Sequence, residues 1–126
     1  MVPDYTEYNF IRTSMSKLIL VVVAAWITGG FYEEIVFRGY IQSIFDKWLK
    51  TGSSYGSVVI TGILFALYHW QQGLFGVIAA FLGGMFWGVL YRQFGNNLWI
   101  PILSHAIFDT VTLIMIYTDL FGNLYR

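Results

Sequence analysis

The chain has 126 residues, of which 57% are apolar, 20% aromatic and only 11% charged, and its formal net charge is zero. Soluble domains carry about 25% charged residues, so this composition is that of a membrane protein of one domain. A neutral chain without a basic run is not expected to bind nucleic acid. The sequence contains no cysteine, which excludes disulfides, thiolate metal sites and a cysteine nucleophile.

The first part of the chain predicts one long apolar helix. Residues 1–16 form a polar lead-in without the basic-then-apolar order of a cleavable signal peptide. The helix is expected to start after Lys17, to loosen or kink at Gly29 and Gly30, and to continue to Lys50. A straight helix of that length would measure on the order of 50 Å, longer than a bilayer core. We therefore expect it to break, to tilt or to project from the membrane.

The remainder of the chain predicts three further helices. A loop at residues 51–57 ends at Ser57, a candidate helix cap, and a short apolar helix follows at residues 58–70. After a turn at residues 71–73, residues 74–91 are apolar, with Gly84 and Gly88 at a spacing that lets helix backbones approach. The last helix has Pro101 in its first turn. The pattern predicts an all-α, multi-pass transmembrane bundle of about four helices, forming one domain over residues 1–126.

Two adjacent carboxylates follow the first apolar run. Glu34 and Arg38 lie one helical turn apart and can pair. Glu33 points about a quarter-turn away, which leaves its carboxylate free for chemistry. Read alone, the segment could equally be a helix end with a solvated charged surface. Ionisable groups in membrane segments are costly, however, and are functional candidates by default.

Two histidines complete the set of polar residues in an apolar background. His69 is the sole titratable group between Lys50 and Arg92 apart from tyrosines. His105 and Asp109 are four residues apart, so their side chains share one helical face. A lone histidine in an apolar helix is more often a packing residue than a catalytic one. Polar side chains on separate membrane helices should nevertheless turn inward, which predicts a single intramembrane polar site.

Three motifs in this set resemble those of the CAAX-protease and bacteriocin-processing (CPBP, or Abi) membrane peptidase family. The family motifs are Glu-Glu-x-x-x-Arg, Phe-x-x-x-His and His-x-x-x-Asn/Asp, and they match residues 33–38, 65–69 and 105–109. They occur in the family's order on separate predicted helices. Members usually carry more membrane helices before the first motif. This chain is thus expected to be a minimal member or the core of a longer protein.

The resemblance implies hydrolysis of a peptide bond inside the membrane by a glutamic-type, metal-independent protease. The expected catalytic residues are Glu33, His69, His105 and Asp109. Glu33 would activate water, and His69 would hold that water or pass a proton to the leaving amine. His105 would donate to the oxyanion, with Asp109 fixing its ring. Glu34 and Arg38 would be structural.

The expected partners are the lipid bilayer and a membrane-associated peptide or protein, either a CAAX-type prenylated tail or a bacteriocin or leader peptide. The resemblance implies an integral, multi-pass protein in the cell membrane of a prokaryote. No cofactor is expected. Two histidines and a carboxylate would also suit zinc, which stays as the weaker alternative. A second alternative is a non-catalytic membrane protein, such as a bacteriocin immunity factor.

Overall fold

The computed structural model describes residues 5–49 and 55–120, and every regular element in those two ranges is helical. The elements are η1 (Thr6–Thr13), α1 (Met15–Ala25), η2 (Trp26–Glu33), η3 (Ile35–Gln42), α2 (Ser43–Leu49), α3 (Gly56–Tyr68), η4 (Trp70–Gln72), α4 (Gly73–Gln93) and α5 (Trp99–Tyr117). The predicted all-α bundle is confirmed, with four helical rods. The predicted loop at residues 51–57 falls mostly on residues 50–54, which lie outside the described ranges.

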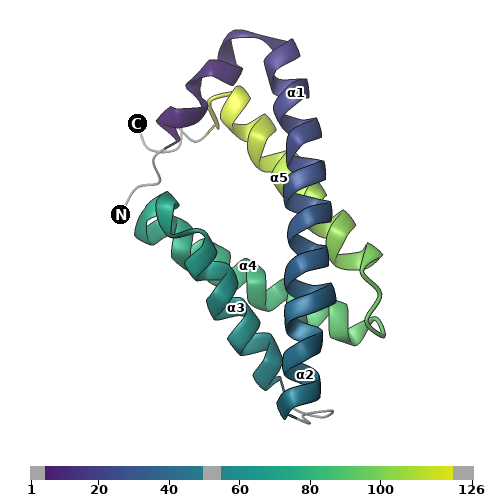
Figure 1. The fold of residues 1–126 in the computed structure, drawn as a ribbon. Coiled ribbons are helices and arrows are strands. Elements are labelled where there is room, and N and C mark those ends of the chain that lie inside the picture. The colour runs from purple at the N-terminus through teal and green to yellow at the C-terminus, as the bar shows by residue number, and fades with distance from the viewer. Residues whose placement is uncertain (1–4, 50–54, 121–126) are drawn as a thin grey trace.

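The first rod is one continuous helix formed by α1, η2, η3 and α2, and it runs the length of the molecule (Figure 1). Its middle, η2 and η3, is a wider π-type helix, a form frequent at functional sites. The two glycines therefore do not interrupt the helix. A Cβ on Gly30 would lie 2.9 Å from Ala106 Cβ and 3.2 Å from the Ile102 carbonyl oxygen. The absence of a side chain at Gly30 thus lets the long helix pack closely on α5.

The second and third rods, α3 and α4, form an antiparallel hairpin joined by η4, and they lie side by side in Figure 1. The predicted close approach at Gly84 and Gly88 is present within this one chain. A Cβ on Gly84 would lie 3.3 Å from Gly62 Cα, and one on Gly88 would lie 2.9 Å from Val58 Cγ1. Gly84 and Gly88 therefore allow α3 to pack closely against α4.

Three helices are long and apolar enough to cross a membrane: Met15–Leu49, Trp70–Gln93 and Trp99–Tyr117. The helix Gly56–Tyr68 is apolar but shorter. Exposed apolar side chains recur every fourth residue along α4, at Leu74, Ile78, Leu82 and Phe86. A continuous apolar outer stripe of this kind suits contact with lipid, which agrees with an integral membrane protein.

The prediction that Ser57 caps helix α3 is wrong. Helix α3 begins at Gly56 with Tyr55 before it, so Ser57 lies inside the first turn. Its hydroxyl is buried and donates to the Asp46 carboxylate, which also pairs with Arg92. The Ser57 hydroxyl was expected to cap the start of the helix. It instead donates a hydrogen bond to a carboxylate of α2.

Element η1 folds against the last helix. Ile11 of η1 is fully buried in a cluster with Leu18, Leu113 and Ile116. Arg12 pairs with Asp119 at 3.1 Å, and its Nε donates to the Ile116 carbonyl at 2.9 Å. Element η1 therefore belongs to the helical bundle.

Candidate active site

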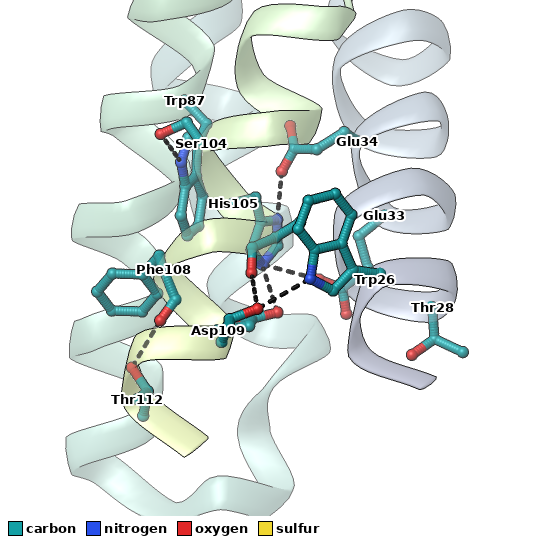
Figure 2. A network of polar contacts seen from close by, with 12 residues as sticks. Trp26, Thr28, Glu33, Glu34, Trp87, Ser104, His105, Phe108, Asp109 and Thr112 are labelled. Carbon is teal, nitrogen blue, oxygen red and sulfur yellow. Dashed lines mark hydrogen bonds and ion pairs between the residues drawn. The ribbon is translucent and has the colours of Figure 1, made fainter. Parts of the chain in front are cut away.

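The residues singled out from the sequence come together at one place, where η2 and η3 face α5 and the end of α3. Glu33 closes η2, Glu34 separates η2 from η3, and His69 caps α3. His105 and Asp109 project from α5 toward the two glutamates (Figure 2). Three separate rods therefore contribute to a single polar cluster, as the inward turn of polar side chains predicts.

Glu33 lies between the two histidines. Its Oε1 is 3.7 Å from His69 Nε2, and its Oε2 is 3.7 Å from His105 Nε2. The side chains of Glu33 and His69 are 14% and 13% exposed, so they are largely but not fully enclosed. Both distances exceed that of a direct hydrogen bond and suit a polar contact bridged by water.

The His105 ring is held by Glu34. Its Nδ1 lies 2.7 Å from Glu34 Oε1, whereas Asp109 Oδ2 lies 3.5 Å from Nε2. A carboxylate accepts, so Nδ1–H donates to Glu34 and Nε2 faces Glu33. The expected fixing of the ring by Asp109 is therefore not what the geometry gives. Glu34, at the junction of η2 and η3, supplies that contact instead.

His69 is held in the same way by its own helix. Its Nδ1 lies 2.8 Å from the Phe65 carbonyl oxygen, which can only accept. The His69 ring also packs on the Phe65 ring with centroids 4.5 Å apart. Both histidines therefore carry their Nδ1 proton away from Glu33 and present Nε2 to it.

Glu34 and Arg38 form the predicted pair, with Arg38 Nη1 3.3 Å from Glu34 Oε1 and both side chains fully buried. Arg38 Nη2 also donates to the Gly84 carbonyl at 2.7 Å, which ties the pair to α4. Glu34 Oε1 thus accepts from both Arg38 and His105. The pair is a support for the histidine as well as for the helix packing.

Two buried residues at this site were missed from the sequence. The Trp87 ring stacks on His105 with centroids 3.9 Å apart and planes 15° apart, and its Nε1 donates to Ser104 at 3.2 Å. Gln42 Nε2 donates to the Gly88 carbonyl at 3.2 Å. The spacing of Gln42, four residues after Arg38, could have revealed it. Trp87 lies in an unbroken apolar run, which offers no such signal.

The described residues contain no group of three or more histidine or acidic side chains arranged to hold a metal ion. The metal-independent chemistry implied by the family resemblance stays a prediction.

Fold and site together define a multi-pass helical membrane protein with a carboxylate–imidazole cluster enclosed between its helices. The chain belongs to the type II CAAX prenyl endopeptidase Rce1-like family, whose model matches residues 15–111. All three motifs lie inside the matched stretch. No curated protein and no solved structure matched the chain. Membership supports, at the level of the family, a CAAX-type endopeptidase of the membrane with a membrane-associated substrate.

Proposed function

We propose that this chain is an intramembrane glutamic endopeptidase, in which Glu33 activates the water that hydrolyses a peptide bond of a membrane-associated substrate. The observation that carries the proposal is the placement of Glu33, whose two oxygens each lie 3.7 Å from a histidine Nε2 on a different rod. A water between these groups would have a carboxylate as base and two imidazoles to orient it.

The reaction begins when Glu33 takes a proton from that water. The water oxygen bonds to the substrate carbonyl carbon, and the C=O electron pair moves onto the carbonyl oxygen. The C–N bond then breaks as the proton held by Glu33 passes to the leaving nitrogen, directly or through His69. The products are a carboxylic acid and an amine, and the glutamate returns to its starting form.

His105 is the proposed donor to the oxyanion. Glu34 and Asp109 lie on opposite nitrogens of its ring, at 2.7 Å and 3.5 Å. When the ring is protonated on both nitrogens, Glu34 balances its charge and Nε2–H is available to the developing oxyanion. Such donors act strongly where water is excluded, and the His105 side chain is only 6% exposed.

The proposed substrates are a prenylated C-terminal peptide and a membrane-spanning leader peptide. Glu33 and His105 lie on two of the helices that are long and apolar enough to cross a membrane, Met15–Leu49 and Trp99–Tyr117, so a substrate anchored in the bilayer would reach them from the lipid phase. Cleavage assays in liposomes that contain one substrate or the other distinguish the two classes.

The test compares Glu33→Gln with Glu7→Gln in liposomes that contain either substrate, with the products identified by mass spectrometry. Glu7 is an exposed carboxylate of η1 and serves as the matched control. We expect Glu33→Gln to lower the cleavage rate by at least about 100-fold and Glu7→Gln to leave it unchanged.

Cleavage that persists in Glu33→Gln would remove Glu33 as the base. Loss of cleavage with a strong chelator and its return with zinc would replace the proposal by metal catalysis. A folded wild-type chain that cleaves neither substrate would overturn the enzymatic function in favour of a non-catalytic role.

A further inference from the structure

Beside the catalytic cluster, four deeply buried side-chain atoms have no hydrogen-bond partner in the part of the chain that the structure describes: Glu34 Oε2, Arg38 Nε, Gln42 Oε1 and Thr61 Oγ1. Each of these side chains is at most 1% exposed. Buried polar atoms in proteins are nearly always paired, with protein or with ordered water. Four such atoms in one region therefore point to a ligand that pairs with them.

The four atoms lie along one face. Glu34, Arg38 and Gln42 follow each other at intervals of four on the long helix, so they occupy successive turns of one side. A Cβ on Gly84 would lie 3.2 Å from Phe65 Cδ1 and 3.3 Å from Arg38 Nη2. A Cβ on Gly88 would lie 2.8 Å from Gln42 Oε1 and 2.9 Å from Val58 Cγ1.

Thr61 lies between Val58 and Phe65 in α3. It follows Val58 by three residues and precedes Phe65 by four, which places all three on one face of α3. The Thr61 hydroxyl therefore belongs to the same seam between η3, α3 and α4, with Arg38 towards one end and Gln42 towards the other.

The hydrogen-bonding roles of the four atoms are complementary to those of water. Arg38 Nε–H donates, Glu34 Oε2 and Gln42 Oε1 accept, and the Thr61 hydroxyl does both. A buried water accepts up to two hydrogen bonds and donates two, and it needs two to four polar partners. An apolar ligand would leave all four atoms unpaired, and an anion would be repelled by the Glu34 carboxylate.

We propose that this seam, lined by Glu34, Arg38, Gln42 and Thr61, is a binding site for a short file of ordered waters. Glu34 and Gln42 are eight residues apart on the long helix, about two turns, which is too far for one water to join them. At least two waters are therefore required, one near Glu34 and Arg38 and another near Gln42, with Thr61 between.

The file gives Thr61 a positioning role in the proposed activity. Glu34 Oε1 holds His105 and Arg38, and a water on Oε2 would fix the rotation of the same carboxylate. This second step rests on the proposed function, whereas the water site itself does not. Two separate measurements test the water site and the positioning role of Thr61.

The first readout is a crystal structure, at a resolution that shows ordered waters, of the wild-type chain and of Thr61→Val. We expect water within about 2.7–3.2 Å of at least three of the four atoms, and loss of the water nearest Thr61 in the variant. A dry seam in which the four atoms pair with one another would overturn the water site.

The second readout is turnover. Thr61→Val should lower kcat by about 3- to 10-fold with KM unchanged, the effect of one lost hydrogen bond, and Thr61→Ser should restore it. Thr112→Val, at an exposed hydroxyl bonded within α5, is the control and should have no effect. Equal kcat for Thr61→Val and wild type would overturn the positioning role and leave the crystallographic result to stand. Failure of the proposed function would instead appear as Glu33→Gln cleaving like wild type.

Discussion

Glu34 and His105, 71 residues apart in the chain, are joined by a 2.7 Å contact between Oε1 and Nδ1. This contact decides which ring nitrogen faces Glu33, because the proton on Nδ1 is committed to a fully buried carboxylate. The first glutamate of the motif, Glu33, thus faces Nε2 of both histidines, and the second, Glu34, holds His105 through its other nitrogen.

Glu34→Gln should lower the activity per folded protein by at least about 100-fold. The amide keeps the size of the carboxylate but can no longer balance a protonated ring, and it can present an N–H to Nδ1 and reverse the tautomer. In a hydrolytic triad the equivalent carboxylate-to-amide change costs about 10⁴ in kcat. The measurement is the cleavage rate in liposomes, with Glu7→Gln as control. Wild-type rates in Glu34→Gln would show that the contact has no part in the reaction.

Arg38→Met should destabilise the protein by about 3–5 kcal/mol, because it leaves Glu34 buried without its cation. Arg12→Gln removes an ion pair whose side chains are about a third exposed, so its cost should be about 1 kcal/mol or less. Unfolding in detergent, followed by circular dichroism against denaturant, compares the two. Equal costs for both substitutions would contradict the view that Arg38 neutralises a buried carboxylate.

Gly30→Ala should destabilise the bundle and lower activity, because the added methyl would meet the Ile102 backbone oxygen at 3.2 Å. Overpacking of this kind costs about 1–3 kcal/mol, more than the roughly 1 kcal/mol that alanine contributes to a helix. Gly39→Ala is the control on the same helix, since its methyl would meet only the end of the Leu98 side chain. The midpoint temperature of thermal unfolding should fall for Gly30→Ala and should stay equal or rise for Gly39→Ala. A Gly30→Ala protein as stable as Gly39→Ala would show that α5 can move away without cost.

Trp87→Phe should lower turnover by about 2- to 10-fold, the range expected when a stacked pair is weakened. Trp87→Leu removes the ring and should lower it further. Phe86→Leu changes the adjacent exposed aromatic residue and should leave turnover unchanged. Rates are measured per folded protein, after size-exclusion chromatography in detergent. Similar rates for Trp87→Leu and Phe86→Leu would mean that the stack does not hold His105.

The gathering of Glu33, His69, His105 and Asp109 could be predicted because each is a costly group in an apolar helix. Because lipid surrounds the helices, such groups are expected to face the interior of the bundle. The same reasoning gave the Glu34–Arg38 pair, since four residues on a helix fix that distance locally. These predictions needed the spacing of residues in the chain and the polarity of the surroundings.

The partner of His105 could not be predicted in this way. Asp109 is four residues from His105 and was the natural choice, whereas Glu34 reaches the ring from another helix, 71 residues away in the chain. Trp87 was hidden for a related reason, since its contacts depend on the packing of α4 on α5. Local spacing does not carry either piece of information.

The hydrogen bonds from Arg38 to Gly84 and from Gln42 to Gly88 both join residues 46 positions apart. Donors and acceptors therefore advance in equal steps along two helices that run in the same direction. A single inserted or deleted residue between the two donors, or between the two acceptors, would rotate one set away from the other. Relatives that change the length of one of these helical segments should carry a compensating change in the other, so that the two segments evolve as a matched pair.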